Sequence, residues 1–200
     1  MTTSDSSFVS LLAHPDFPKE VVRRLAARAQ LLSPDVLRLE YVLEADPRRV
    51  RIPPPVADDG RADRLWAHTC FEAFLAVEES AQYLELNFSP STQWAAYRFE
   101  SYRQGMEPVA LGAAPRLVLR RGQKQLELQA EVSLGGTLAA PPREPKASEN
   151  RRLRLALSAV VEDREGGLSY WALWHPPGRP DFHHPRSFSL TLEFPRTDPP

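Results

Sequence analysis

The segment from Tyr83 to Ser89 alternates apolar side chains with polar ones that could bind a ring of hydroxyl groups. Because successive side chains of a strand point to opposite faces, Glu85 and Asn87 are expected on one face, and Glu72 could join them. Carboxylates accept hydrogen bonds and amides both donate and accept, while Arg98 would add a planar pair of donors. The alternative is an ordinary solvated sheet face with cross-strand pairs, and the sequence leaves both interpretations open.

The four tryptophans could also contact a sugar, because an indole face packs against the apolar face of a sugar ring while its N–H still donates. Core packing is the alternative for each of them, since large aromatic side chains are mostly buried. Trp171 and Trp174 are an odd number of residues apart, so in a regular strand at most one is expected in the core. We take Trp94 and Trp171 as candidate ligand contacts.

A proline-rich segment holds three of the five histidines together with an aspartate, namely His175, Asp181, His183 and His184. These are metal-ligand types, but their spacing matches no defined metal motif. Histidine also serves as a neutral hydrogen-bonding partner, and loops held by a rigid scaffold often carry binding residues. The sequence therefore predicts that these four residues contact the ligand and that no metal is bound.

The motifs of common enzyme classes are absent from the sequence, which has no G-x-S-x-G elbow, phosphate loop, dinucleotide fingerprint or H-E-x-x-H. Glu72 and Glu85 could in principle serve as the carboxylate pair of a glycosidase, but nothing in the sequence indicates that their pKa values are pushed apart. Cys70 and His68 are two apart on a strand, which does not make a nucleophile and base pair. We expect a protein without catalytic activity.

A haem group, a further alternative, would need axial ligands such as a methionine and a histidine. Met106 is the only internal methionine, and His183 or His184 would have to be its partner. The methionine lies at the expected end of a strand, and we predict that the protein uses no cofactor.

Period-2 alternation of apolar and polar residues is the strongest structural signal, and it predicts strands with one buried face. It is clearest in four segments, Val36–Glu44, Lys124–Leu134, Arg152–Val161 and Ser187–Phe194. Shorter or less regular runs complete the set, at Arg48–Ile52, Thr69–Glu78, Tyr83–Ser89, Trp94–Tyr102, Leu117–Arg120 and Leu168–Trp174. Many short strands at regular spacing are typical of an all-β sandwich or barrel.

The segment Pro18–Leu32 is rich in alanine, arginine and leucine and begins with a proline, which favours a helix by propensity. Ser33, Pro34 and Asp35 that follow it are good turn residues, and the next strand would pair most simply with an antiparallel predecessor. We therefore predict a strand hairpin here.

The 200 residues, 42% of them hydrophobic, predict one domain over residues 1–200, with a surface loop at residues 138–150. The 25 basic and 26 acidic residues nearly cancel, so nucleic acid is not expected as a partner. No apolar run approaches the roughly 18 residues of a membrane span, and no secretory signal is seen. With its single cysteine, Cys70, which is expected to be buried and inert, the chain is expected in the cytoplasm.

Three stretches resemble DOMON-like proteins of bacteria, namely LWAHTCFEAFL at Leu65–Leu75, YLELNFSPSTQWAAYRFESYRQGM at Tyr83–Met106 and LSYWALWHPPGRPDFHHP at Leu168–Pro185. The first two also resemble paired strands of family-9 carbohydrate-binding modules, through Cys70-Phe71-Glu72 and Glu85-Leu86-Asn87-Phe88-Ser89-Pro90. The resemblance implies a β-sandwich with a ligand site on one sheet face. It names no ligand, because the wider group is similar to both sugar-binding and haem-binding domains. The histidine-containing loop has no counterpart in the sugar-binding modules.

The sequence as a whole predicts a non-catalytic, antiparallel β-sandwich that binds a small polar molecule, such as a saccharide. A protein-interaction module without a small-molecule site is the alternative, and a haem-binding domain is a weaker one.

Overall fold

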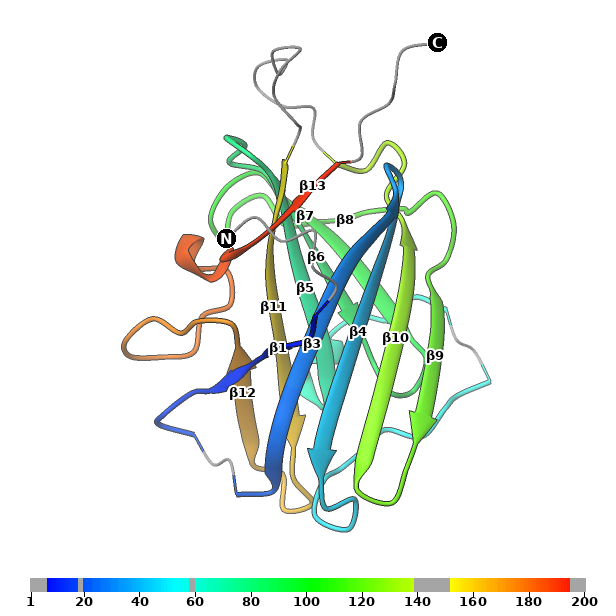
Figure 1. The fold of residues 1–200 in the computed structure, drawn as a ribbon, viewed down its shortest axis with the longest axis vertical. Coiled ribbons are helices and arrows are strands. Elements are labelled where there is room, and N and C mark those ends of the chain that lie inside the picture. Colours follow the sequence, from blue (N-terminus) through cyan, green and yellow to red (C-terminus); the bar gives the residue numbers. More distant parts are fainter. Residues whose placement is uncertain (1–6, 18–19, 58–59, 139–151, 195–200) are drawn as a thin grey trace.

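The computed structural model describes residues 7–17, 20–57, 60–138 and 152–194, whose regular structure is nearly all antiparallel β-sheet. Figure 1 shows two twisted sheets packed face to face. The five-stranded sheet has the order β1-β3-β4-β10-β9. The eight-stranded sheet has the order β2-β12-β11-β5-β6-β7-β8, with β13 also paired to β11. The predicted antiparallel β-sandwich is confirmed.

The strands of both sheets are, in chain order, β1 (Val9–Ser10), β2 (Leu12–Ala13), β3 (Val22–Ser33), β4 (Val36–Ala45), β5 (Cys70–Val77), β6 (Tyr83–Phe88), β7 (Trp94–Phe99), β8 (Glu107–Pro108), β9 (Arg116–Arg121), β10 (Gln125–Ser133), β11 (Arg152–Glu162), β12 (Leu168–Ala172) and β13 (Leu190–Glu193). Within the described ranges the helical elements are two single 3-10 turns, η1 (Leu65–Ala67) and η2 (Pro185–Ser187). No helix in that part of the chain is long and apolar enough to cross a membrane.

The segment before Ser33 forms strand β3, which confirms the predicted hairpin over the competing helix. β3 pairs with β4 along almost its full length, from Val22 opposite Ala45 to Ser33 opposite Val36. β1 pairs with the other edge of β3. Helix propensity is worth less than about 1 kcal/mol per residue, so the burial gained between two neighbouring strands outweighs it.

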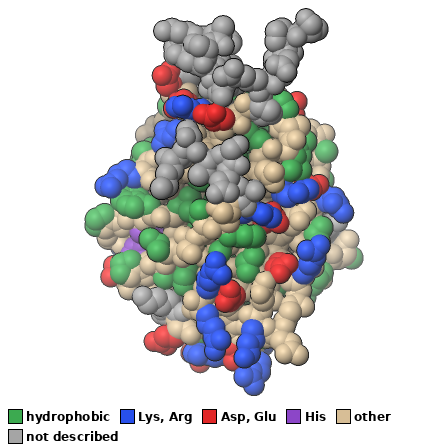
Figure 2. Space-filling view, in the orientation of Figure 1, with side chains coloured by type: hydrophobic (Ala, Val, Ile, Leu, Met, Phe, Trp, Pro, Cys, Tyr) green, Lys and Arg blue, Asp and Glu red, His purple; other side chains and the backbone are tan. Residues whose placement is uncertain are grey.

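The outer face of the five-stranded sheet carries charges of both signs, which Figure 2 shows interspersed over this side of the molecule. Several form cross-strand pairs: Arg38 Nη2 lies 2.7 Å from Glu131 Oε1, and Arg28 Nε lies 2.7 Å from Glu40 Oε2. Opposite charges on neighbouring strands are the usual pattern of a solvated sheet face.

The main hydrophobic core fills the space between the two sheets, because each strand turns every second side chain inward. Tyr41 of β4 is fully buried there, and its ring centroid lies 5.1 Å from that of Phe71 in β5. The Tyr41 hydroxyl donates a hydrogen bond of 2.7 Å to the backbone carbonyl of Glu72. This bond crosses the core and links the five-stranded sheet to the strand that carries Glu72.

A second hydrophobic cluster covers the outer face of the eight-stranded sheet, so its central strands are buried on both sides. Every residue of β5 and β6 is buried. The cluster combines Phe74, Tyr97 and Ala156 of the sheet with Phe182 and Phe188, which come from the chain after β12. We call residues 175–184 the covering loop. The contrast with the solvated five-stranded sheet shows which face of the sandwich is built to exclude water.

Three expectations about the elements differ from the structure or lie beyond it. The run at Arg48–Ile52 forms only an isolated bridge, between Val50 and Asp163, because this segment passes the end of the sandwich. In the last segment Phe188 packs on the outer face while Leu192 belongs to the core, because turn η2 breaks the alternation. The predicted loop at residues 138–150 lies, apart from residue 138, outside the described residues.

Candidate ligand-binding site

The outer face of the eight-stranded sheet holds a pocket of about 490 Å³ under the covering loop. This volume is within the range of small-molecule sites. The sheet supplies its floor and the covering loop one wall. Its lining residues are Trp66, Ala67, Glu72, Glu85, Phe99, Arg103, Met106, Val160, Leu168, Tyr170, Pro180, Phe182 and His183.

Glu72 lies on β5 at the floor of this pocket and is only 3% exposed. Its neighbours in the ladder are Ser158 of β11 and Asn87 of β6. Neither Glu72 Oε1 nor Ser158 Oγ has a hydrogen-bond partner among the described residues, although both atoms are buried. Burial, and next the nearby charge of Glu85, raise the pKa of Glu72 well above its usual value. Buried polar atoms are nearly always hydrogen-bonded in proteins, so Glu72 Oε1 and Ser158 Oγ both retain unused hydrogen-bonding capacity.

Glu85 of β6 is also buried, with 6% exposure, but it has partners in the protein. Asn87 Nδ2 donates to Glu85 Oε1 over 2.8 Å, and His183 Nε2 lies 3.7 Å from Glu85 Oε2. Burial raises the pKa of Glu85, while the Asn87 hydrogen bond and the charge of Arg103 act in the opposite direction. Burial therefore raises the pKa of both carboxyl groups.

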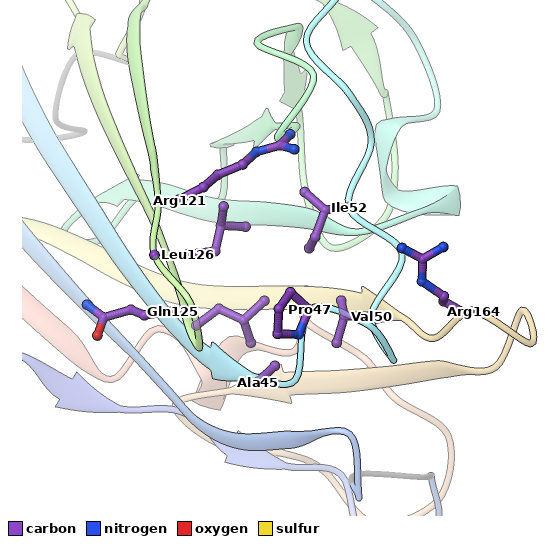
Figure 3. Close-up of a pocket in the computed structure, with 10 residues that line it drawn as sticks. Ala45, Pro47, Val50, Ile52, Arg121, Gln125, Leu126 and Arg164 are labelled. Carbon is purple, nitrogen blue, oxygen red and sulfur yellow. The ribbon is translucent and has the colours of Figure 1, made fainter.

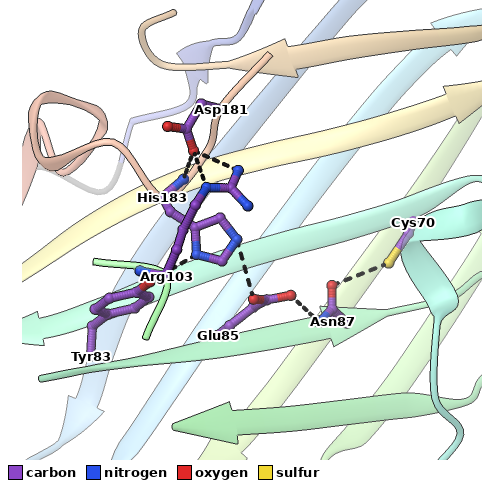
Figure 4. A network of polar contacts seen from close by, with 7 residues as sticks. All are labelled: Cys70, Tyr83, Glu85, Asn87, Arg103, Asp181 and His183. Atoms are coloured by element: carbon purple, nitrogen blue, oxygen red, sulfur yellow. Dashed lines mark hydrogen bonds and ion pairs between the residues drawn. The ribbon is translucent and has the colours of Figure 1, made fainter. Parts of the chain in front are cut away.

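A chain of polar contacts connects the covering loop to these strands, as Figure 4 shows. The Arg103 backbone N–H donates to the Tyr83 hydroxyl over 3.1 Å, and that oxygen lies 2.9 Å from His183 Nδ1. Since the tyrosine oxygen already accepts one bond, we assign its proton to His183 Nδ1, which leaves the histidine proton on Nε2, facing Glu85. Burial lowers the pKa of His183 to about 4, so the ring is neutral near pH 7.

Asp181 fastens the covering loop to the turn between β7 and β8. It accepts hydrogen bonds from Arg103 Nε and Nη2, at 3.1 and 2.7 Å, and from the hydroxyl of Tyr102. It also accepts the backbone N–H of His183 over 3.1 Å, which orients the histidine toward the pocket. Both guanidinium nitrogens donate to the same carboxylate oxygen, Oδ1, and bonds between charged partners are stronger than neutral ones. We call it the Arg103–Asp181 clasp.

Four aromatic rings, those of Trp66, Phe99, Tyr170 and Phe182, line the pocket around the carboxyl groups. Phe99 stands 5.0 Å from the His183 ring, edge to face. Trp66 is held by an edge contact with Tyr97 at 5.7 Å, and that tyrosine hydroxyl donates to Asp63. The site thus combines two carboxyl groups with aromatic surface.

The structure brings together Glu72, Glu85, Asn87, Asp181 and His183 from the set predicted by the sequence. Three other predicted contacts, Trp94, Arg98 and Trp171, have the opposite strand parity and lie on the other face of the sheet. Trp94 and Trp171 belong to the main core. Arg98 donates to the backbone carbonyl of Thr137 over 3.1 Å. The polar alternation was interpreted correctly for β6, but strands β7 and β12 present the neighbouring residues to the pocket.

The two remaining predicted contacts, His175 and His184, brace the covering loop instead of lining the pocket. His175 Nε2 lies 2.8 Å from the backbone carbonyl of Leu12. His184 accepts a hydrogen bond from the Arg186 backbone N–H at the start of η2, and its ring packs on Trp174 at 4.9 Å.

Within the described residues no group of three or more histidine, cysteine, aspartate or glutamate side chains could hold a metal ion. Cys70 is buried and unpaired, and burial raises the pKa of its thiol.

Sequence reasoning missed Trp66, Phe99, Arg103, Tyr170 and Phe182, all of which line the pocket. Tyr170 could have been found, because a core position for Trp171 places its neighbour on the outer face. For Arg103 the sequence offers only a weaker indication, the glycine in the tight turn that contains it. Gly105 there has φ +66, and an added Cβ would lie 2.5 Å from Glu100 Cγ, so a glycine fixes this tight turn.

A smaller pocket of about 160 Å³ lies at one end of the sandwich, between the sheets. Figure 3 shows apolar side chains, including Val50, Ile52 and Leu126, with Arg121 and Arg164 at its edge. The Arg121 guanidinium donates to the Pro53 backbone carbonyl over 3.2 Å. None of the residues that line it is a buried polar side chain, so this pocket is the weaker candidate.

No protein-family model matches this chain, and neither does any curated protein sequence. Among solved structures, it is similar to a proposed carbohydrate-binding protein from Bacteroides uniformis, with a TM-score of 0.68 and 15% identity over 94% of this chain and 86% of that one. It is also similar to a family-9 carbohydrate-binding module from Caldicellulosiruptor kristjanssonii in complex with cellotriose, with a TM-score of 0.50 and 10% identity over 97% and 85%. At these identities the comparisons show that this chain has the same sandwich fold as family-9 carbohydrate-binding modules.

Proposed function

We propose that this protein is a non-catalytic module that binds a small saccharide in the pocket under the covering loop. One observation carries the proposal: Glu72 is buried at the floor of a pocket lined by aromatic rings, and its Oε1 atom has no partner in the described structure. A sugar hydroxyl both donates and accepts, so it can satisfy this atom and the neighbouring Ser158 hydroxyl together. The aromatic rings offer flat apolar surfaces to the sugar ring.

The similar structures support a saccharide as the ligand class. One is a proposed carbohydrate-binding protein, and the other was solved with cellotriose. The protein-interaction alternative receives less support from the site, because a partner surface is expected to be an exposed apolar patch. Here the aromatic residues surround a concave pocket with buried carboxyl groups.

Calorimetric titration with glucose and cellobiose tests the proposal, since no catalysis is required for the readout. We expect wild-type protein to bind at least one of them, and Glu85→Gln to bind more weakly. The glutamine amide would meet the Nε2–H of His183, donor against donor. Glu127→Gln, on the five-stranded sheet, is the matched control and should bind as wild type.

Retained affinity in Glu85→Gln, in a protein that still unfolds cooperatively, would place the ligand elsewhere. Absence of binding for every sugar tested would remove the saccharide proposal. Release of products from the disaccharide during titration would contradict the non-catalytic assignment.

A further inference from the structure

The charges around the pocket point to a more specific ligand than a neutral sugar, and this step rests on the saccharide-binding function proposed above. Two carboxyl groups, Glu72 and Glu85, lie on the floor, and no cationic side chain among the described residues forms an ion pair with Glu72. Arg103 is the cation of the pocket lining, but its guanidinium is held by Asp181 in the clasp. The two glutamates therefore lack a dedicated counter-charge.

His183 does not supply that charge either. Its Nε2 lies 3.7 Å from Glu85 Oε2. Its Nδ1, however, accepts a hydrogen bond from the Tyr83 hydroxyl, and burial keeps the ring neutral. A metal ion is not the missing cation, because the described residues form no cluster that could ligate one. An organic cation brought by the ligand would supply a counter-charge to the ionised carboxylates.

We propose that the ligand is an amino sugar whose protonated amine binds between Glu72 and Glu85. An ammonium group has three donors and no acceptor, which matches carboxylates that need donors. The amine would reach Glu72 Oε1, the buried atom without a partner, while the sugar ring packs on the aromatic lining. Aromatic faces also attract cations, so Trp66 and Tyr170 favour the same charge.

Because two carboxyl groups are buried together, the charge of the ligand, and not only its shape, should determine its affinity for the pocket. Glu72 is surrounded by Cys70 on its own strand, Glu85 on β6, Tyr170 on β12 and, through the core, Tyr41 on β4, none of them a cation. Glu85 is adjacent to the neutral His183 and within the field of Arg103. The pKa of both glutamates is raised, so at low pH they hold protons that an ammonium group would displace.

Titration calorimetry with glucosamine, glucose and N-acetylglucosamine at pH 7 tests this inference, because the three differ mainly at one position and only the first carries a charge. We expect glucosamine to bind about tenfold or more tightly than the other two, as charge-assisted hydrogen bonds allow. Glu72→Gln should lose this preference, because an amide has no negative charge to pair with the ammonium group, and Glu127→Gln should keep it.

A second measurement uses only wild-type protein, in case the variant does not fold. In the acidic range, where the amine stays protonated, glucosamine should release protons on binding, seen as a dependence of the measured heat on buffer ionisation enthalpy. Its affinity should rise between pH 5 and pH 7 as the carboxyl groups ionise. Glucose should show neither effect.

Equal affinity for glucosamine and glucose would overturn the amino-sugar inference and leave the saccharide site standing. Equal affinity for glucosamine and N-acetylglucosamine would overturn it as well, because the substituent rather than its charge would then be recognised. Absence of binding for all three sugars would overturn the saccharide function and this inference together.

Discussion

Glu72 and Glu85 lie diagonally across strands β5 and β6, each on the face of the eight-stranded sheet that points away from the main core. The register that pairs Glu72 with Asn87 places Glu85 two residues further along the same face. Both side chains are buried, which is costly for carboxyl groups in the absence of counter-charges. The cost is consistent with a site shaped for a ligand, and it leads to measurable effects of pH and substitution.

The first prediction concerns stability of the Glu72→Gln variant. Folding raises the pKa of Glu72, so between its unfolded and folded pKa values the unfolded chain binds fewer protons, and the free energy of unfolding falls as pH rises. A glutamine does not ionise. We therefore expect Glu72→Gln to be more stable than wild type at pH 8, with the difference shrinking toward pH 4, in urea denaturation over that range. Parallel pH profiles for the two proteins would contradict this.

The second prediction concerns acid. The pKa of His183 is lowered to about 4 from a usual value of 6.5, so between these values the unfolded chain binds more protons and stability falls as pH decreases. One pKa unit corresponds to about 1.4 kcal/mol, so this histidine should contribute a loss of roughly 3 kcal/mol between pH 7 and pH 4. His183→Asn should flatten the profile in that range. An unchanged slope in His183→Asn would refute the assignment.

A third prediction addresses the Arg103–Asp181 clasp. Asp181→Asn removes the charge from a contact that orients His183 and holds the covering loop. Because the Arg103 side chain is half exposed, we expect a stability loss of only about 1 kcal/mol. Sugar affinity should fall by a factor several times larger than this loss of stability corresponds to. The reason is that the covering loop, which forms one wall of the pocket, becomes less ordered before binding. The control is Asp46→Asn, which removes the exposed ion pair between Asp46 and Arg48 just after β4. It should leave sugar affinity unchanged. Unaltered affinity in Asp181→Asn would show that the clasp is dispensable.

A fourth prediction separates the two faces of the eight-stranded sheet by a pair of tryptophan substitutions. Trp66→Ala removes an aromatic wall of the pocket and should weaken sugar binding about tenfold. Trp94→Phe alters the main core, where the indole N–H has no partner among the described residues, and should leave affinity within about twofold of wild type. Calorimetry is the suitable measurement, because removing a tryptophan changes the intrinsic fluorescence of the protein. Loss of binding in Trp94→Phe with unchanged binding in Trp66→Ala would indicate that the ligand binds on the inner face of the sheet.

Alternation along single strands was enough to predict the sandwich and part of the site. Tyr83, Glu85 and Asn87 share one face because successive side chains of a strand point in opposite directions, and this holds whatever the strand pairs with. The hairpin at Ser33 was likewise predicted from its turn residues, against the helix propensity of the preceding segment.

The sequence alone could not decide which parity of β7 and β12 faces the ligand. Trp94, Arg98 and Trp171 were plausible contacts by residue type, but pairing with β6 and β11 turns them to the inner face of the sheet. The covering loop is a similar case: His183 reaches the pocket while His175 and His184 bind backbone elsewhere. Residue types and alternation, which are local properties, indicated the fold class, most of the strands and the carboxyl pair of the candidate site. The tertiary structure alone decided which face the covering loop buries and which side chains meet there, because those contacts join residues far apart in the chain.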